Sequence, residues 1–210
     1  MSLRIGLIDY GMGNLHSVAR AVERLGAELI HVLDAPAMEE CAALILPGVG
    51  SFDPAMERLH LAGLADPLRE WSARERPLLG ICLGLQLLFE GSDEGKAPGL
   101  GLLKGRVRAL PSSPGHPIPH MGWAPLISTN PSPLLPEGHS AAWVYFVHSY
   151  AAAPDDPACT TAEVLFADQP VTAAVWQGAL AACQFHPEKS GPQGQRMLER
   201  WLGWVEEGGT

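Results

Sequence analysis

Short apolar runs alternate with amphipathic segments along the first half of the chain. Residues 4–8, 42–46 and 77–81 are almost wholly apolar, which is typical of parallel strands covered on both faces. Segments between and after these runs repeat apolar residues at helical spacing. The pattern predicts strands over 4–8, 28–33, 42–46 and 77–81 and helices over 14–25, 53–60, 64–74 and 83–90. We therefore expect an α/β fold with an open, mostly parallel sheet and helices on both faces.

Two residues bound the first predicted helix. Asn14 is a good N-cap, and Gly26 is a plausible stop before the next strand. The glycine-rich turn at 10–14 raises nucleotide binding as an alternative, but His16 stands where G-x-G-x-x-G needs its last glycine. No lysine marks a phosphate-binding loop there, and we expect no nucleotide cofactor.

Proline dominates the middle of the chain and excludes long helices there. Between residues 96 and 142 the sequence predicts loops and antiparallel hairpins beside the main sheet, as an added antiparallel strand region, with 119–123 expected as a loop. Apolar and polar residues then alternate again. This pattern predicts strands over 143–150, 161–167, 171–177 and 179–185, with a hairpin turn at 177–178. A last helix is predicted over 192–205, with one core face formed by Met197, Leu198, Trp201 and Val205. The tail over 206–210 is expected to fray.

Composition narrows the classes of function. A chain of 210 residues with 47% hydrophobic composition suits a single domain spanning residues 1–210. The net charge of −9, without a cluster of lysine or arginine, argues against nucleic acid or an anionic membrane as a partner. No apolar stretch approaches the ~20 residues of a bilayer span, and no signal-peptide pattern opens the chain. We therefore expect a cytoplasmic protein.

Cysteine and histidine usage gives little support to a metal site. The 4 cysteines include no C-x-x-C pair, which favours reduced thiols over disulfides or zinc ligands. His116 and His120 are four apart, but the prolines between them exclude the helix that would place both on one face, and no H-E-x-x-H appears. We expect no metal.

Cys82 lies between two glycines at a predicted strand-to-helix corner. The segment 80–84 has the Gly-x-Cys-x-Gly spacing of a nucleophile elbow, in which small neighbours permit a tight and strained turn. The N-terminus of the following helix stabilises a thiolate and a developing oxyanion. The alternative is a buried cysteine that only packs, as free cysteines often do. The elbow pattern favours a nucleophile.

Three further features suit acyl transfer through a thioester. His186 and Glu188 end the last predicted strand, where residues i and i+2 share a face. They therefore suit a general base and the carboxylate that orients it. The alternative is an ordinary strand end. Gln86 lies one helical turn after Cys82, where it either bonds a substrate or faces solvent. The loop at 47–50 either turns an N–H toward a bound carbonyl or is a simple turn.

Several motifs resemble one family. LPGVGSF at 46–52, GICLGLQLLFE at 80–90 and QFHPEKSG at 184–191 occur in the order of the class I (triad) glutamine amidotransferases. More specifically, DYGMGNLHSV at 9–18, PHMGW at 119–123 and YFVHSY at 145–150 resemble the glutaminase subunits of imidazole glycerol phosphate synthase. The resemblance spans residues 5 to 203, nearly the whole chain, and implies a flavodoxin-like sheet.

The resemblance also implies roles and partners. Members of the family hydrolyse glutamine and pass ammonia to a (β/α)₈-barrel cyclase subunit, with which they form a heterodimer, and they need no cofactor. By that resemblance, Cys82, His186 and Glu188 form the triad; N–H groups at Leu83, Val49 and Gly50 hold the oxyanion; Gln86, Glu94, Ser149 and Tyr150 bind glutamine; and Asn14, Met121, Trp123 and Lys189 face the partner.

Chain length supports the expectation of a partner. The motifs occupy nearly all of the 210 residues and leave no room for a synthase domain, so ammonia released here would be used by another chain. The alternatives are a glutaminase subunit of pyridoxal phosphate, anthranilate or GMP synthesis, or a noncatalytic regulatory subunit of the same fold. Ala124, where the family usually has asparagine, departs from the pattern at the expected partner face, and the proline-rich stretch 111–119 is atypical.

Overall fold

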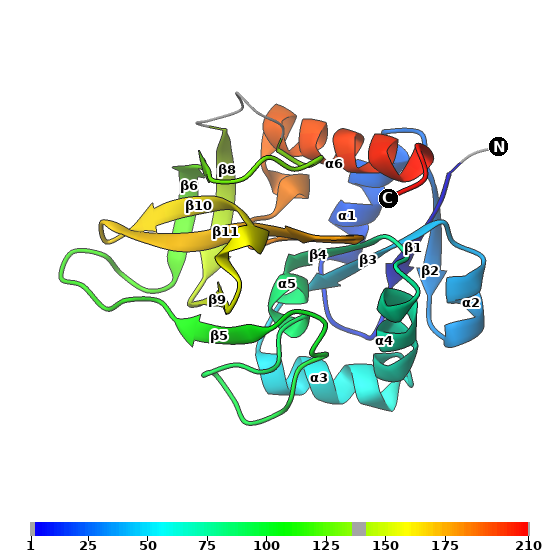
Figure 1. The fold of residues 1–210 in the computed structure, drawn as a ribbon, viewed down its shortest axis with the longest axis horizontal. Coiled ribbons are helices and arrows are strands. Elements are labelled where there is room, and N and C mark those ends of the chain that lie inside the picture. The colour runs from blue at the N-terminus through cyan, green and yellow to red at the C-terminus, as the bar shows by residue number, and fades with distance from the viewer. Residues whose placement is uncertain (1–2, 136–141, 210) are drawn as a thin grey trace.

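An eight-stranded sheet forms the centre of the protein (Figure 1). The computed structural model describes residues 3–135 and 142–209. Along the sheet the strands are ordered β2 (Glu28–Val32), β1 (Arg4–Ile8), β3 (Ala43–Gly48), β4 (Leu78–Cys82), β12 (Leu180–Cys183), β11 (Gln169–Gln177), β10 (Thr160–Phe166) and β7 (Ile127–Ser128). Neighbours from β2 to β12 are parallel, and those from β12 to β7 are antiparallel. The predicted α/β class is confirmed, and the order of the parallel part is that of a flavodoxin-like sheet.

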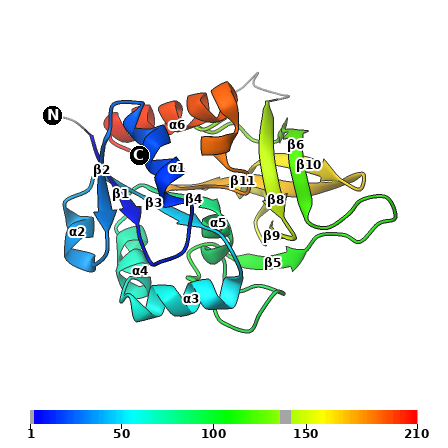
Figure 2. The same cartoon turned by 180° about the vertical axis from the view of Figure 1, so that it is seen from behind.

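Helices cover both faces of this sheet (Figures 1 and 2). Each face has its own buried apolar cluster, one formed with α1 and α6 and the other with α3, α4 and α5. The helices are α1 (Leu15–Glu23), α2 (Ala35–Glu39), α3 (Phe52–Leu61), α4 (Ala65–Ala73), α5 (Leu83–Leu87) and α6 (Gly191–Glu206), with two short 3₁₀ turns, η1 (Pro157–Cys159) and η2 (Pro187–Lys189). None of the described helices combines the length and apolar composition needed to cross a membrane.

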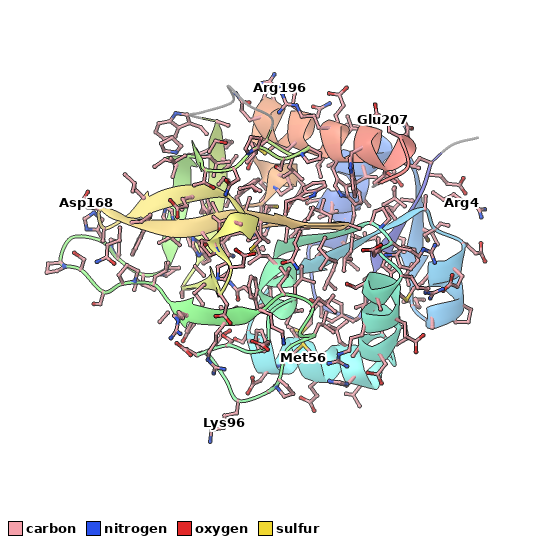
Figure 3. The ribbon with its side chains drawn as sticks, viewed as in Figure 1. Arg4, Met56, Lys96, Asp168, Arg196 and Glu207 are labelled. Carbon is pink, nitrogen blue, oxygen red and sulfur yellow. The ribbon has the colours of Figure 1, made fainter. Side chains whose placement is uncertain are left out.

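Amphipathic spacing explains how the long helices dock. On α6, the predicted core positions Met197, Leu198, Trp201 and Val205 are all buried. Their spacing of three or four residues forms one apolar stripe, which packs on the sheet while the opposite side meets solvent. In Figure 3, Arg196 and Glu207 point outward at the two ends of α6, and Asp168 lies at the tip of the β10–β11 hairpin.

Two small antiparallel sheets lie beside the main sheet, as predicted for the proline-rich region. In one, β6 (His120–Pro125) pairs with β8 (Trp143–His148), and in the other, β5 (Gly105–Ala109) pairs with β9 (Tyr150–Pro154). Val144 and Phe146 of β8 join the cluster of α1 and α6, whereas Ala152 of β9 joins the opposite cluster. Ala151 of β9 belongs to the first cluster, so β9 contributes side chains to both clusters and the chain breaks between β8 and β9 at Ser149.

These small sheets correct two expectations. The predicted strand over 143–150 is wrong as a single strand, because apolar alternation has the same period on both sides of Ser149 and does not mark the break. The predicted loop at 119–123 is also wrong, since His120 to Trp123 belong to β6 and pair with β8. Pro136, within the proline-rich region, lies outside the described residues.

Some helices end at other residues than the sequence pattern predicts, because tertiary hydrogen bonds replace those within the helix. The elbow helix α5 ends at Leu87 rather than 90, because the carbonyls of Leu88 and Phe89 accept hydrogen bonds from the loop at 101–103. Asn14 sits at the N-cap of α1 but its side chain makes no capping bond, and α1 ends at Glu23. The short helix α2 was not expected, although Asp34 caps it by accepting from the Ala37 N–H at 3.0 Å.

Strand ends and the tail also shift. β3 continues through Gly48, into the predicted 47–50 loop, and β12 ends at Cys183, short of 185. The expected fraying of 206–209 is wrong: the N–H groups of Gly208 and Gly209 bond back to Val205 and Trp204, and Gly209 is buried. Position 210 lies outside the described residues.

Two glycines of α6 give a matched test of this packing. A Cβ on Gly194 would overlap the carbonyl oxygen of Pro187, whereas a Cβ on Gly203 meets nothing within 4 Å. We expect Gly194→Ala to lower the free energy of unfolding by about 1–3 kcal/mol through overpacking. Gly203→Ala should raise it by up to about 1 kcal/mol, because alanine favours helix. Urea denaturation of both variants checks this, and equal effects would contradict the close approach of α6 to η2.

Candidate active site

Cys82 forms the sharp corner between β4 and α5. Its φ of 56° and ψ of −111° lie outside the regions that L-residues favour. Such a backbone costs on the order of 1–3 kcal/mol and persists only where the surroundings enforce it. The side chain is buried but reaches a cavity at the carboxyl end of the strand. The corner thus presents the thiol at the sheet edge where open α/β sheets collect ligands.

Glycines make room for this corner. A Cβ on Gly84 would overlap the carbonyl oxygen of Leu46 in β3. A Cβ on Gly80 would lie 2.9 Å from the Leu85 nitrogen, and one on Gly48 would lie 2.8 Å from the Leu83 Cβ. Because larger residues would push α5 off the sheet, the glycine spacing is a steric requirement of the elbow.

His186 and Glu188 form a buried pair facing the cysteine. The Nδ1 of His186 lies 2.8 Å from the Glu188 Oε1, and the two side chains are 3% and 1% exposed. The expectation that an extended segment aligns them is wrong, because Glu188 belongs to η2 and the chain turns between them. Ser190 stabilises this turn: its Oγ donates to the His186 carbonyl at 2.6 Å and accepts from the Tyr145 N–H at 2.9 Å.

The carboxylate and the thiol control the charge of His186. Burial by itself lowers the pKa of this imidazole, but interaction with Cys82 and with Glu188 outweighs burial and raises the pKa to about 9. The Nε2 of His186 has no hydrogen-bond partner of strict geometry within the described part of the chain, although interaction with Cys82 contributes to the raised pKa. His186 is therefore placed to hold a proton beside the sulfur at neutral pH.

A cavity of about 260 Å³ opens beside this pair. The structure brings the sequence-predicted residues from distant parts of the chain to its walls. Glu94 is among them, and its Oε2 accepts from the Phe52 N–H at 2.9 Å. Gln86 is 5% exposed, so the alternative of a solvated helix residue is wrong. The walls include Val49, Gly50, Cys82, Leu83, Gln86, Glu94, His148, Ser149, Tyr150 and His186.

Sequence reasoning missed three polar residues around the site. Tyr10 donates from its hydroxyl to the Pro47 carbonyl at 2.9 Å and holds the start of the 47–50 loop; burial raises its pKa, with a smaller effect from Cys82. Gln184 is fully buried and its Nε2 lies 3.8 Å from the Cys82 Sγ. His148 is also buried and lines the cavity. Each belongs to a motif quoted above, but only the fold shows what it touches.

The residues expected at the partner face come from elements that pack together. Met121 and Trp123 are 63% and 52% exposed on the outward side of β6, and Lys189 is exposed on the neighbouring η2 turn. Asn14 precedes α1, which packs against η2. Ala124 is 9% exposed and faces the core, so the departure at this position concerns packing rather than a contact on the outward face.

The described residues contain no group of three or more His, Cys, Asp or Glu that could hold a metal ion. His120 instead pairs with His148, at 3.2 Å between its Nδ1 and the Nε2 of His148. All four cysteines are free.

An open parallel sheet with a cysteine elbow facing a His–Glu pair defines the class, that of the triad amidotransferases. A family model described as glutamine amidotransferase class-I matches residues 6–203. The chain belongs to this family and, within it, to the imidazole glycerol phosphate synthase subunits HisH, as the sequence resemblance predicted.

Two curated relatives show how close this relationship is. Imidazole glycerol phosphate synthase subunit HisH of Synechococcus sp. (strain CC9605) is 60% identical, over 99% of this chain and 98% of the relative. Subunit HisH 2 of Parasynechococcus marenigrum (strain WH8102) is 56% identical, with the same coverage of 99% and 98%.

Solved structures share the fold at low identity. A crystal structure titled glutamine amidotransferase has a TM-score of 0.73 at 23% identity and covers 95% of this chain and 98% of its own. The structure of PurLQS from Thermotoga maritima has a TM-score of 0.75 at 21% identity and covers 98% and 100%. At these identities the likeness supports the fold alone.

The pKa values of two histidines of the site should be shifted in opposite directions. Burial, as the largest cause, lowers the pKa of His148 to about 4, whereas the pKa of His186 is raised from 6.5 to about 9. His186 therefore stabilises the fold fully below pH 6.5 and loses that contribution as the pH rises through 9. His148 stabilises it above pH 6.5 and loses that contribution as the pH falls toward 4.

NMR titration of the imidazole resonances checks both values. In Glu188→Gln the pKa of His186 should fall by about 1 unit or more, because the neighbouring negative charge is gone, while the pKa of His148 stays low. An unchanged pKa of His186 in Glu188→Gln would show that the carboxylate does not control it.

Proposed function

We propose that this protein is a glutaminase that hydrolyses glutamine to glutamate and ammonia through a thioester on Cys82. The observation that carries the proposal is the shared cavity: a strained cysteine and a histidine with a raised pKa, backed by a buried carboxylate, meet at its walls. A histidine beside a thiol at this kind of corner is the arrangement of a cysteine nucleophile and its base. The family of the chain supports the same activity.

In the first half of the reaction the Cys82 sulfur attacks the carboxamide carbon of glutamine. His186 takes the thiol proton and delivers it to the leaving nitrogen, so that ammonia departs as the C–N bond breaks. Glu188 holds the Nδ1 side of the imidazole and stabilises its positive charge. The oxyanion that forms is bonded by N–H groups at Leu83, Val49 and Gly50, whose residues line the cavity.

In the second half, water hydrolyses the thioester. His186 removes a proton from the water as its oxygen attacks the acyl carbon, and the C–S bond breaks to give glutamate. The proton on His186 then returns to the Cys82 sulfur, which restores the starting state. No group outside the chain other than water enters this half of the reaction.

Polar groups on the cavity wall suit the amino-acid end of glutamine. Glu94 supplies a carboxylate for the α-ammonium, and Ser149 and Tyr150 lie where β8 ends and β9 begins. Gln86 places an amide beside them. We assign these four residues to substrate binding, because a zwitterion needs donors and acceptors on the same wall.

We further propose that ammonia passes to a partner. The curated relatives carry the name of a synthase subunit, and the outward side of the β6–β8 sheet exposes Met121 and Trp123, with Trp143 at 54% exposure on the same sheet. Such an aromatic patch is typical of an interface. The partner we propose is the (β/α)₈-barrel cyclase that makes imidazole glycerol phosphate in histidine biosynthesis, as a cytoplasmic heterodimer.

The identity to HisH relatives favours this synthase over pyridoxal phosphate, anthranilate or GMP synthesis. The intact Cys82, His186 and Glu188 favour an enzyme over a noncatalytic subunit of the same fold.

Removing the nucleophile tests the chemistry. Cys82→Ser should lower glutamate release from glutamine by about 1000-fold or more, because a neutral hydroxyl is a far weaker nucleophile than a thiol held beside a histidine. Cys159→Ser, the same change at a buried cysteine of η1, should keep wild-type turnover. A glutamate-release assay with both variants decides the point, and hydrolysis by Cys82→Ser at the wild-type rate would remove the mechanism.

Binding of the cyclase tests the partnership. Glutaminase activity should be low alone and rise about tenfold or more with the cyclase and its ribulosyl nucleotide ligand, a coupling in the usual range for linked sites. Trp123→Ala should weaken this activation, whereas Leu61→Ala, which removes an exposed apolar side chain at the end of α3, should not. Titrating cyclase into the glutaminase assay measures both, and equal activity with and without the cyclase would contradict the coupling.

A further inference from the structure

A buried side chain outside the Cys–His–Glu triad contacts the reactive sulfur. Gln184 directly follows β12, is 0% exposed, and donates from its Nε2 to the Cys82 Sγ at 3.8 Å. Its Oε1 accepts from the Nε2 of Gln86 at 3.0 Å. Gln184 thus stands between the nucleophile and a residue of the cavity wall, with both ends of its amide in use.

The orientation of both amides follows from one backbone carbonyl. The Nε2 of Gln86 also lies 3.0 Å from the Tyr150 carbonyl oxygen, which can only accept. The NH₂ group of Gln86 must therefore face Tyr150, and its second hydrogen goes to the Oε1 of Gln184. This leaves the NH₂ group of Gln184 facing the sulfur, so the structure supplies Cys82 with a directed hydrogen-bond donor.

Two histidines extend the network to β6. The Nδ1 of His148 lies 2.9 Å from the same Tyr150 oxygen, so this nitrogen carries the proton. Burial lowers the pKa of both His148 and His120, which favours the neutral form of each ring. The Nε2 of His148 then accepts, and the Nδ1 of His120 donates to it across 3.2 Å. His120 also stacks on Phe146, with ring centroids 5.0 Å apart.

We propose that Gln184 is a positioning residue that holds the Cys82 sulfur and favours its thiolate, and that His120, His148, the Tyr150 carbonyl and Gln86 set its orientation. The proposal deepens the glutaminase function proposed above and rests on it. The network begins at His120, one residue before Met121, which is exposed on the outward side of β6. A change in β6 on partner binding would therefore be transmitted to Cys82 through these hydrogen bonds.

A donor to sulfur matters here because the other groups around Cys82 act in opposite directions. His186, when protonated, favours the thiolate. Negative charge on Tyr10 or Cys183 would oppose it, and the electrostatic effect of Cys82 contributes to raising the pKa of both these groups. Gln184 is uncharged, so its N–H bond stabilises a sulfur anion at any pH. Losing such a bond to a charged group typically costs about tenfold or more in the equilibrium it supports.

The test replaces the donor and follows the thiol directly. Gln184→Met keeps an unbranched side chain but removes the N–H, so the pH midpoint of Cys82 alkylation by iodoacetamide should rise by about 1 unit or more. The kcat for glutamine should fall about tenfold while KM changes less than about twofold. Gln177→Met, the same change at the exposed end of β11, should match the wild type. An unshifted pH profile in folded Gln184→Met would overturn the proposal.

His120→Phe tests the network without touching the buried amides. It removes the donor to His148 but keeps a ring against Phe146, and it should shift the alkylation midpoint in the same direction by a smaller amount. In a double variant with Gln184→Met the effect of His120→Phe should vanish, because both act through one path. If the shifts of the two single variants add in full, His120 does not act through Gln184 and the proposed network is wrong. If Gln184→Met does not fold, a wild-type alkylation midpoint in His120→Phe would equally contradict the network.

The two proposals fail separately. A shifted alkylation profile together with glutamine hydrolysis by Cys82→Ser would leave Gln184 as a positioning residue and refute the glutaminase mechanism. An inactive Cys82→Ser together with an unshifted Gln184→Met profile would refute only the positioning role.

Discussion

The close contact between α5 and β3 is the constraint on which the site depends. Gly84 lies against the Leu46 carbonyl, where no Cβ fits, and this contact sets the turn that gives Cys82 its φ of 56°. The same approach brings Leu83 beside Gly48 and so places the helix N-terminus next to the 47–50 loop. The two faces of packed helices supply the stability that a strained residue draws on. A site of this kind is therefore a property of the whole sheet, not of the cysteine alone.

The second half of the chain completes what the elbow begins. The backbone of Tyr145 in β8 accepts from the His186 N–H at 3.0 Å and donates to Ser190, so the small β6–β8 sheet holds the turn that carries His186 and Glu188. The break between β8 and β9 at Ser149 supplies part of the cavity wall. Since Trp123 and Tyr145 contact each other edge to face, the exposed face of the sheet and the base of the site share one element.

The sequence predicts those parts of the molecule that depend on local pattern. The parallel strands, the apolar stripe of α6 and the glycine spacing around Cys82 are all readable, because period and turn chemistry act over a few residues. The strand β6 and the break at Ser149 are not, because long-range pairing overrides a proline-rich context. Gln184 contacts a residue 102 positions away, and Ala124 faces inward only because of its register with Val144, so neither could be placed without the fold.

The central claim is that the sulfur of Cys82 attacks the carboxamide of glutamine and carries the acyl group. Trapping that acyl group tests the claim most directly. Enzyme mixed with glutamine in the presence of the cyclase, quenched in acid during turnover and digested, should yield a peptide with one glutamyl group on Cys82, released by hydroxylamine as expected of a thioester. Glutamate formation at the full rate with no acyl group on Cys82, or with the group on another residue, would contradict the account.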